Sequence, residues 1–590
     1  MLIAKNSKMK MVKIIDSVEE DTYTCPLCGE KLERKFGLQN QFFSHPKGRG
    51  DNCELKLKLM LKNNPNEFED EELNILKEQY YNKEFSDVKI EMSDYMSNEG
   101  YYLTEEQKSI IFAKEDRIKI TALAGSSKST TLFYYSKENP NKKILYLVYN
   151  KSMKLEGDIM FKDLHNVTIK TTHGLAYQYV GRFYKNKLTF NYNAIDVMKD
   201  LKLNFRYDQE IAVKTYEMFK GYMLSEVATF KELDMYMDAK NRDDIIALCE
   251  RLWELKKDRY NDIKVEHDFY LKTFQLEKRN LSNTYDIILL DEAQDSNLLM
   301  LDILNSSKVV GQVLVGDQFQ QLYSWRNACN VLPKFKGKEY KLNTSFRVSQ
   351  NIANICNMIV GDISDNTIAM KGFNTKQKIV DRIDKSKLYV VLCRTNSSLF
   401  GETMSCINSG KKALYYIGGY SGYNFNNILD CYNFSQGSKT KNHLFNKFQN
   451  YFQMVDYAEK NEDIELLALI RMVKEYGGAI PELIEKIKSS TTTKREKSDV
   501  IFSTIHKSKG STFPMSVLIS DDHFDIEKVY KKKFIEMDKA YFIDKDFYEE
   551  MCCVYVSCTR CAGEIELSDK LKNYLIMRYK FNKNNKTKII

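Results

Sequence analysis

Asp291 and Glu292 are the first residues whose types and spacing suggest chemistry, because they follow directly on the apolar run from Ile287 to Leu290. The run does not alternate with polar residues, so we expect a strand that is buried on both faces of a parallel sheet. Ligands bind at the carboxyl ends of such strands. There Asp291 could hold Mg²⁺, directly or through water, and Glu292 could orient and deprotonate an attacking water. The structural alternative is a strand that ends in solvated acids.

A second candidate is the small-residue loop before Lys128, within Ile118-Lys-Ile-Thr-Ala-Leu-Ala-Gly-Ser-Ser-Lys-Ser-Thr-Thr131. A short apolar strand, such a loop and a helix that opens with Lys-Ser are the parts of a phosphate-binding loop. Lys128 would reach the β- and γ-phosphate oxygens, and Ser129 would offer its hydroxyl oxygen to Mg²⁺. Ser127 stands where Gly usually precedes the Lys. It could fit with a negative φ, or it could crowd the γ-phosphate.

Polar residues follow two further predicted strands, a buried one at 144–148 and another that begins at Val167. Asn150 and Lys151 come after the first, and Thr172 and His173 after the second. Parallel strands end at one edge of a sheet, so these side chains could hold a phosphate backbone together. The alternative is that each of them caps the helix that follows its strand.

A third region of interest follows the apolar stretch that ends at Gly316-Asp317. Gln320 could reach a γ-phosphate, and Tyr323 and Trp325 could face nucleic-acid bases, where stacking contributes roughly 1–3 kcal/mol per base. Phe346 offers a flat face to adenine, and Arg347 suits the charge of a phosphoryl-transfer transition state.

The N-terminus contains a candidate zinc site. Cys25-Pro-Leu-Cys28-Gly has the spacing of a zinc knuckle, and His45 and Cys53 are the candidates for the remaining ligands. A segment this short needs a metal or a similar cross-link to fold. The stretch resembles the N-terminal zinc motif of competence protein CoiA, and it could contact DNA or dock a protein partner.

The composition limits the class of protein. The 590 residues allow roughly three to five domains. The net charge of +8 is compatible with a polyanionic partner, and the 13 cysteines, mostly in apolar contexts, indicate reduced buried thiols. We see no apolar run long enough to span a membrane and no signal-peptide core, so we expect a soluble intracellular protein.

The second half of the chain adds a strand that ends at Arg394, the stretch Thr504-Ile-His506-Lys507-Ser-Lys-Gly510, and Val554-Tyr-Val-Ser-Cys-Thr-Arg560. These stretches, together with six earlier ones, resemble the motifs of UvrD-like superfamily 1 DNA helicases. The earlier stretches are, in order, Leu-Thr-Glu-Glu-Gln, Ala-Gly-x-x-Lys-Ser, Thr-His-x-Leu-Ala, Asp-Glu-Ala-Gln-Asp, Gly-Asp-x-x-Gln-x-x-Tyr-x-Trp-Arg and Ser-Phe-Arg. The amino-acid sequence of these motifs is most similar to that of the F-box DNA helicase branch, although we recognise no F-box in the chain. The family usually has Leu-Glu-Phe after the Gly, so Ser511-Thr512-Phe513 lacks a carboxylate expected to touch the ribose.

The resemblance implies ATP and Mg²⁺ as cofactors and single-stranded DNA, or DNA with single-stranded/duplex junctions, as the partner. It also implies movement in the 3′ to 5′ direction. The candidate catalytic residues are Lys128, Asp291, Glu292, Gln320, Arg347 and Arg560. The candidate nucleotide contacts are Gln107, Ala124, Gly125, Ser126, Ser127, Lys128, Ser129, Thr130, Phe346 and Gly510. The candidate DNA contacts are Asn150, Lys151, Thr172, His173, Tyr323, Trp325, Arg326, Arg394, His506 and Lys507.

We therefore expect an α/β protein with two RecA-like P-loop domains, helical insertions and a small N-terminal zinc module. The expected divisions are a zinc-binding module (1–60), a helical connector (61–99), a first RecA-like domain (100–181 and 281–345) with a helical insertion (182–280), a second RecA-like domain (346–400 and 497–575) with a second insertion (401–496), and a basic tail (576–590).

Other interpretations stay open. Ser127 and the missing carboxylate would also suit a weakened relative that acts as a DNA-binding scaffold. An RNA helicase of the same superfamily fits less well, and a nuclease is disfavoured because no further acidic cluster beside a Lys stands out. The bias toward Asn, Lys, Ile and Tyr suggests an AT-rich bacterial or phage genome, and hence the cytoplasm of a bacterial or phage-infected cell.

Overall fold

The computed structural model describes residues 3–5, 11–13, 23–24, 31–36, 41–44, 70–83, 89–204, 207–234, 239–322, 330–364, 369–440, 442, 444–461, 463–520, 526 and 545–587. The chain divides into two compact units, Met1–Glu71 and Glu72–Ile590. The first unit contains an antiparallel sheet of order β2-β1-β3-β4-β5, built from β1 (Ile3–Lys5), β2 (Met11–Lys13), β3 (Tyr23–Thr24), β4 (Lys31–Phe36) and β5 (Gln41–Ser44). The predicted zinc ligands Cys25, Cys28, His45 and Cys53 lie outside the described residues, so that site remains a prediction.

The second unit contains a parallel six-stranded sheet of order β10-β9-β13-β14-β8-β15. Its helices form two layers, one on each face. Tyr146 and Val148 pack in one core with α4, while Leu145 and Leu147 pack in the other with α6 and α11. Strands β9, β13 and β14 are therefore buried on both faces, as predicted for the run from Ile287 to Leu290, whereas β10 at the edge of the sheet is only partly buried. The strands are β8 (Arg117–Ala122), β9 (Ile144–Val148), β10 (Val167–Thr171), β13 (Ile287–Leu290), β14 (Gly311–Gly316) and β15 (Lys338–Leu342), and the helices are α3 (Glu105–Ile111), α4 (Lys128–Lys137), α5 (Lys151–Met160), α6 (Thr172–Tyr179) and α11 (Leu298–Ser306). We call this sheet and its helices the first lobe.

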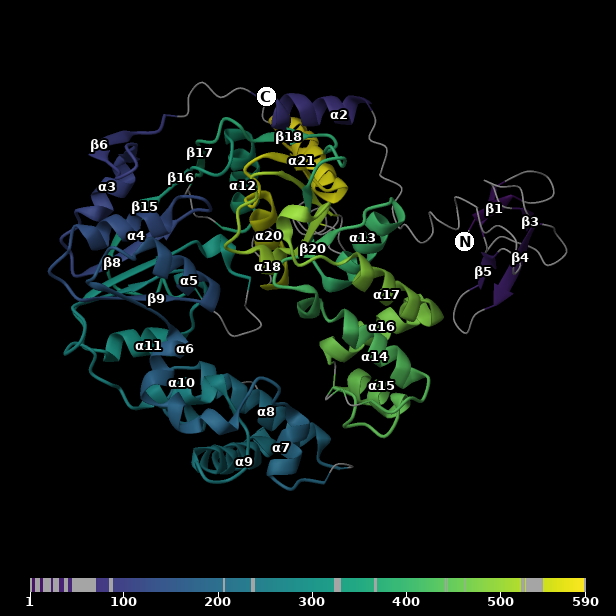
Figure 1. Cartoon of the computed structure of the whole chain (residues 1–590), viewed down its shortest axis with the longest axis horizontal. Helices are drawn as coiled ribbons and strands as arrows, with labels where there is room; N and C mark the ends of the chain where they lie inside the picture. The colour runs from purple at the N-terminus through teal and green to yellow at the C-terminus, as the bar shows by residue number, and fades with distance from the viewer. Residues whose placement is uncertain are drawn as a thin grey trace. The chain divides into compact units, whose positions relative to one another are not determined.

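The segment between α6 and β13, where we proposed an insertion at 182–280, is mainly helical. Its helices are α7 (Ala194–Asp200), α8 (Gln209–Leu224), α9 (Ala239–Lys257) and α10 (His267–Leu276), and α7 to α9 lie together below the first sheet (Figure 1). A short parallel pair, β11 (Leu188–Thr189) with β12 (Val265–Glu266), was not anticipated from the sequence.

A second parallel sheet has six strands in the order β18-β23-β22-β19-β21-β20. The strands are β18 (Lys378–Val380), β19 (Tyr389–Cys393), β20 (Leu414–Tyr416), β21 (Val500–Thr504), β22 (Ser516–Ile519) and β23 (Glu564–Glu566), and the accompanying helices are α12 (Gln350–Gly361), α13 (Asn396–Asn408), α18 (Ile505–Ser508), α20 (Lys545–Cys558) and α21 (Asp569–Thr587). We call this sheet and these helices the second lobe.

Strand β20 lies inside the expected second insertion, 401–496, yet it forms the edge of the second sheet beside β21. The helices that follow it are α14 (Phe425–Ser435), α15 (Tyr451–Lys460), α16 (Ile464–Tyr476) and α17 (Ile480–Ser490). The part of 401–496 that stands apart from the second sheet therefore begins after β20.

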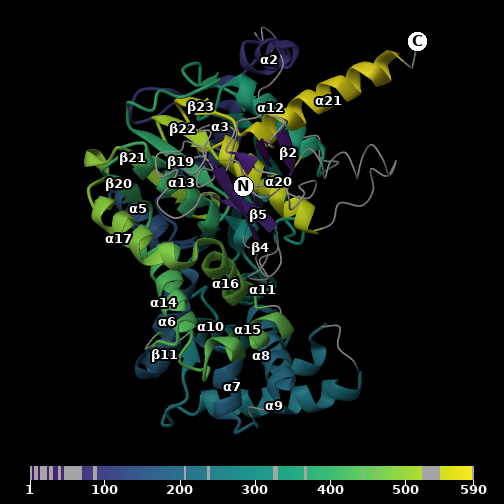
Figure 2. The same cartoon turned by 90° about the vertical axis from the view of Figure 1, so that its right-hand side faces the viewer.

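The start of the second unit contacts both lobes. Helix α2 (Asp70–Leu76) continues into a π-helical turn, η2 (Lys77–Tyr81), and there Tyr80 Oη donates to Leu575 O of α21 at 3.1 Å. The chain then forms the hairpin of β6 (Met92–Met96) and β7 (Tyr102–Thr104), which leads into α3. Thr104 and Gln107 form a capping box at the start of α3. At the other end of the chain, α21 continues through much of the expected basic tail as far as Thr587 (Figure 2).

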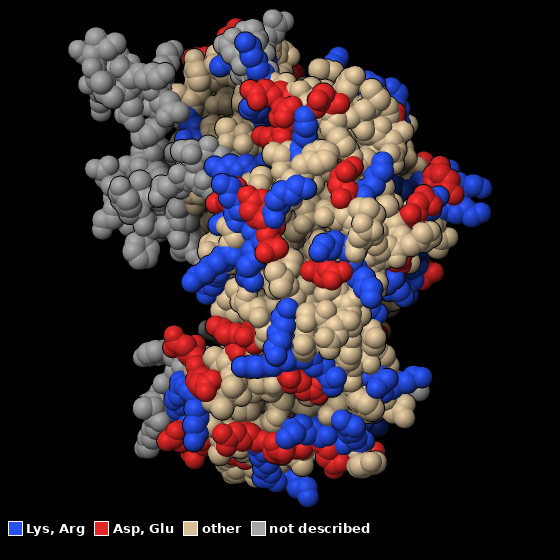
Figure 3. Space-filling model, turned by 90° about the vertical axis from the view of Figure 1, so that its left-hand side faces the viewer, with Lys and Arg blue, Asp and Glu red and all other residues tan. Residues whose placement is uncertain are grey.

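The surface charge is mixed. Figure 3 shows Lys and Arg side chains interspersed with Asp and Glu over the face it presents, so this face offers no uniform basic track. A membrane-crossing helix, which would need to be long and apolar, is not found in the part of the chain that the structure describes.

Candidate functional site

The loop between β8 and α4 has the backbone path of a phosphate-binding loop. Gly125 has a φ of +75°, and a Cβ there would lie 2.6 Å from both Ser345 Oγ and Arg347 Cβ, so this position requires glycine. Ser127 has φ +59° and ψ +44°, the left-handed conformation that glycine adopts readily. Of the two possibilities that we considered for Ser127, the fit with a negative φ is therefore excluded. The serine instead follows the glycine path, at a cost of about 1–2 kcal/mol.

Two hydroxyl groups beside this loop suit phosphate oxygens. Ser126 Oγ and Ser345 Oγ are both buried without a hydrogen-bond partner among the described residues. Buried polar groups normally have a partner. Two such hydroxyls near Gly125 therefore fit a site that receives a polar ligand.

The acid pair lies where the sequence predicted, at the carboxyl end of β13. Asp291 is 2% exposed, and its Oδ2 accepts hydrogen bonds from Tyr146 Oη at 2.7 Å and from Ser129 Oγ at 3.3 Å. Magnesium in nucleotide sites is bound by one or two protein oxygens together with water and phosphate. The Ser129 hydroxyl and the Asp291 carboxylate fit that donor set. A cluster of three or more His, Cys, Asp or Glu that could hold a metal without a nucleotide is not found within the described ranges.

Glu292 is ionised, and each of its two carboxylate oxygens already has a partner. Its backbone is left-handed, with φ +52°, and Lys128 Nζ lies 3.4 Å from Glu292 Oε1 while Gln294 Nε2 donates to Oε2. Burial alone would raise the pKa of Glu292, but the nearby Lys128 and Lys509 outweigh burial and lower that pKa to about 2. Glu292 must therefore exchange Lys128 for a water before it can act as a base.

The expected γ-phosphate contacts come together from both lobes. Gln320 Nε2 donates to Asp317 Oδ2 at 2.7 Å, and Arg560 Nη2 donates to Gln320 Oε1 at 3.0 Å. Arg347 Nη1 donates to the carbonyl of Thr559 at 3.0 Å. Arg560 is 1% exposed, which excludes a solvated surface role, and burial together with Arg347 lowers its pKa to about 9.

Tyr555, Asp317 and Lys509 belong to this site, although the sequence analysis assigned them no role. Tyr555 Oη accepts from Ala124 N at 3.0 Å and donates to Asp317 Oδ2 at 3.0 Å. Lys509 Nζ donates to Asp295 Oδ2 and, at 2.5 Å, to Gln320 O. All three residues stand inside the quoted motifs, but the contacts of Tyr555 with Ala124 and Asp317 and of Lys509 with Asp295 join distant parts of the sequence, and no spacing indicates them.

The remaining nucleotide candidates surround the loop. Gln107 is buried, and its Nε2 donates to Thr131 Oγ1 of α4 at 3.3 Å. Phe346 N donates to Gly125 O at 2.9 Å, which ties the adenine-facing candidate to the loop. Thr130 lies in the first turn of α4, and Gly510 has a left-handed φ of +82° just after α18.

The DNA candidates of the first lobe lie at helix starts. Asn150 Oδ1 accepts from Met153 N at 2.9 Å, so Asn150 caps α5, and Lys151 beside it is exposed. Thr172 opens α6, and His173 Nε2 lies 2.9 Å from Asp268 Oδ1 of α10. The predicted contacts Tyr323, Trp325 and Arg326 lie outside the described residues.

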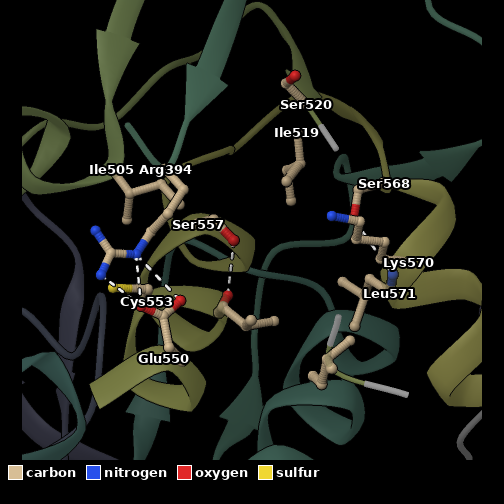
Figure 4. Close-up of a pocket in the computed structure, with 12 residues that line it drawn as sticks. Arg394, Ile505, Ile519, Ser520, Glu550, Cys553, Ser557, Ser568, Lys570 and Leu571 are labelled. Carbon is tan, nitrogen blue, oxygen red and sulfur yellow. Dashed lines mark hydrogen bonds and ion pairs between the residues drawn. The ribbon is translucent and has the colours of Figure 1, made fainter. Parts of the chain in front are cut away.

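The DNA candidates of the second lobe contact other parts of the protein. Arg394 Nε lies 2.9 Å and 3.1 Å from the two oxygens of Glu550, beside a cavity of about 40 Å³ (Figure 4). His506 has its pKa lowered to about 4 by burial and by the charges of Arg394 and Lys509, so it is neutral. Lys507 Nζ donates to the carbonyl of Gly422 and lies 3.8 Å from the ring centre of Tyr423.

Comparison with known proteins agrees with this geometry. Residues 103–337 match the family described as the UvrD/REP helicase N-terminal domain. The chain is 29% identical to F-box DNA helicase 1 of Gallus gallus over 80% of its own length and 50% of that relative, and 23% identical to F-box DNA helicase protein 1 of Schizosaccharomyces pombe over 80% and 58%. A probable DNA helicase II homolog of Mycoplasma genitalium is 23% identical over 44% of the chain and 42% of that protein.

The chain thus spans about half the length of the F-box DNA helicases it matches. The family match covers the phosphate loop, the acid pair and Gln320, while the longer alignments cover most of the chain. Residues 103–337 are therefore similar to the UvrD/REP helicase N-terminal domain, and the similarity of most of the chain to proteins named DNA helicases supports a likeness to the UvrD-like superfamily 1 helicases.

Proposed function

We propose that this protein is an ATP-dependent translocase or helicase that moves 3′ to 5′ on single-stranded DNA, including DNA with single-stranded/duplex junctions. The observation that supports it most is the convergence of phosphate-loop, acidic and Arg groups from both lobes around Gln320. Two curated relatives that align with 80% of the chain carry the name DNA helicase. The residues of this convergence are Lys128, Asp291, Glu292, Gln320, Arg347 and Arg560.

Each side chain has a distinct role in this proposal. Bound ATP and Mg²⁺ supply the phosphoryl group and neutralise part of its charge. Lys128 and the loop amides bind the phosphates, and Ser129 and Asp291 hold the metal. Glu292 orients a water and takes its proton once Lys128 has turned to the phosphates. Gln320, Arg347 and Arg560 stabilise the charge that develops on the transferred group.

Movement would follow from the opening and closing of the two lobes, which we propose as two RecA-like domains, with β20 counted in the second domain and the second insertion beginning after it. Loss of the γ-phosphate removes contacts that join the lobes and so biases them to open. DNA would lie along Asn150, Lys151, Thr172 and His173, with Trp325 stacking on a base. Arg394, His506 and Lys507 could join this track only after leaving their present partners.

The N-terminal unit would be a structural zinc module that binds DNA or a protein partner. Its four proposed ligands are Cys25, Cys28, His45 and Cys53. Metal analysis of the purified protein, with Cys25→Ser for comparison, tests this proposal directly. Equimolar zinc that disappears in the variant supports it, and zinc-free protein contradicts it.

The second candidate function is a DNA-binding scaffold with weak ATPase activity. It is favoured by the strained Ser127 and by Ser511 and Thr512 standing where the family has a carboxylate. The complete set of catalytic candidates argues against it, because a scaffold would need neither Glu292 beside Lys128 nor Arg560 bonded to Gln320.

Steady-state ATP hydrolysis, measured with and without single-stranded DNA, separates the two functions. We expect DNA to stimulate hydrolysis and Glu292→Gln to lower the stimulated rate about a hundredfold or more, the usual contribution of a positioned base. Glu254→Gln, a change to an exposed acid paired with Lys257 on α9, is the matched control. Absence of stimulation, together with no effect of Glu292→Gln, would establish the scaffold. Single-stranded RNA in place of DNA tests the RNA helicase alternative.

A further inference from the structure

Tyr555 connects the second lobe to the phosphate loop of the first. It lies on α20 with 0% exposure, and its hydroxyl makes hydrogen bonds of 3.0 Å both to Ala124 N and to Asp317 Oδ2. Ala124 belongs to the loop after β8, and Asp317 follows β14. One oxygen on a second-lobe helix therefore bonds to two separate segments of the first lobe.

The direction of these bonds is fixed by chemistry. A backbone N–H can only donate, so the Tyr555 oxygen accepts from Ala124 and gives its single proton to Asp317. Burial and the neighbouring Asp317 carboxylate raise the pKa of Tyr555 well above its ordinary value of 10, so the phenol keeps this proton. A phenylalanine ring of the same shape could make neither bond.

Asp317 links Tyr555 to Gln320 through hydrogen bonds to one carboxylate oxygen. The same oxygen, Asp317 Oδ2, accepts both from Tyr555 Oη and from Gln320 Nε2, while Gln320 Oε1 accepts from Arg560 Nη2. Tyr555 lies in the last turn of α20, which ends at Cys558, and Arg560 follows two residues after that end, so a movement of this helix displaces both ends of the Gln320 amide together.

We propose that Tyr555 is a positioning residue that transmits movements of the second lobe to the phosphate loop and, through Asp317, to Gln320. The inference rests on the proposed function, because it concerns how an ATPase site is coupled to lobe movement. Tyr555 does not contact the reacting atoms in this role. It sets the orientation of the loop amide and of the side chain that would meet the γ-phosphate.

The same helix supplies a matched control. Tyr548 lies two helical turns before Tyr555, on the same face of α20, and its hydroxyl donates to Gln318 O at 3.3 Å. It also reaches from the second lobe to the first, but it bonds neither to the loop nor to Asp317. Tyr548→Phe therefore removes a similar hydroxyl without the proposed connection.

Hydrogen exchange and kinetics of Tyr555→Phe and Tyr548→Phe test the inference. Loss of a buried hydrogen bond of typical strength corresponds to about a tenfold change. We expect amide exchange in a peptide that contains Ala124 to rise by about this factor in Tyr555→Phe, and DNA-stimulated kcat to fall by a similar factor with a smaller change in KM for ATP. Tyr548→Phe should leave exchange and the ratio of stimulated to basal kcat unchanged.

The outcomes separate this inference from the proposed function. Unchanged loop exchange in Tyr555→Phe overturns the inference even if the protein is an active helicase. Equal effects of both variants on kcat and KM, accompanied by equal falls in Tm, also overturn it, because they indicate a merely structural role. If wild-type protein hydrolyses no ATP, the proposed function fails, while increased exchange in Tyr555→Phe alone still supports the connection between Tyr555 and the loop.

Discussion

Ser127→Gly tests whether the serine in the phosphate loop is a tolerated substitution or a defect. Ser127 already has the left-handed backbone that glycine would adopt, at φ +59°. Its carbonyl accepts from Thr131 N at 3.0 Å and from Thr131 Oγ1 at 3.1 Å, so the loop is joined to α4 in the ordinary helical way. The backbone amides therefore do not need glycine to reach their positions, and the affinity for ATP should change less than about threefold.

The expected change lies in stability. The left-handed conformation costs a non-glycine residue about 1–2 kcal/mol, and this strain disappears in Ser127→Gly. Glycine loses about 0.5–1 kcal/mol more conformational entropy on folding, which offsets part of the gain. We expect a net stabilisation of at most about 1.5 kcal/mol, which corresponds to a rise in Tm of no more than roughly 3–6 °C for a lobe of ordinary domain size.

The assay compares wild type, Ser127→Gly and Ser127→Ala in thermal unfolding and in ATP-dependent kinetics. Alanine keeps the strained Cβ and removes only the hydroxyl, so it isolates the contribution of that group. A tenfold or larger gain in kcat/KM for Ser127→Gly would refute our reasoning, because it would show that the serine side chain crowds the phosphates. Equal losses in both variants would also refute it, by showing that the hydroxyl itself binds the nucleotide.

Further predictions concern the contacts between the lobes. Arg560→Ala removes the donor to Gln320 Oε1 and should lower kcat by about a hundredfold or more with little change in KM for ATP, as steady-state kinetics can measure. Burial raises the pKa of Asp295 from 3.8 to about 6, so this carboxyl binds a proton more readily in the folded state, and its contribution to stability falls as pH rises through that window. The stability of wild type relative to Asp295→Asn should therefore fall by about 1 kcal/mol between pH 5 and pH 7, measured by urea unfolding. Arg394→Ala leaves Glu550 without its bidentate partner and should lower Tm, while the salt dependence of DNA binding keeps its slope.

The sequence predicted the parts of the site that one strand and its following turn determine. Uninterrupted apolar runs identify doubly buried strands, and the residue after such a strand lies at the ligand edge of the sheet, so Asp291 and the loop before Lys128 could be found. Contacts between the lobes could not be found from the sequence. Lys509 and Asp295 are 214 residues apart, and nothing near either residue indicates the other.

Short elements were missed for a different reason. β20 contains only Leu414–Tyr416, and its place in the second sheet depends on pairing with β21 rather than on a long apolar pattern. The Asn150 side chain shows the opposite problem, because the residue types that cap helices also bind phosphate. Sequence alone left both interpretations open, and the structure has Asn150 capping α5.

The charges around the site would allow a bound nucleotide to control the contact between the lobes, as the proposed function requires. The buried carboxylates Asp295 and Asp317 and the acid Glu292 belong to the first lobe, whereas the cations Lys509 and Arg560 come from the second. Opposite charges therefore join the lobes even where Lys128 is held by Glu292. A phosphate that enters beside Lys128 would compete with the first-lobe groups for Lys509 and Arg560. Nucleotide binding would therefore exchange the partners of these two cations. Because the pairs are buried, salt should weaken them far less than it weakens contacts with DNA phosphates. Raising the ionic strength should accordingly abolish stimulation by DNA before it affects hydrolysis in the absence of DNA.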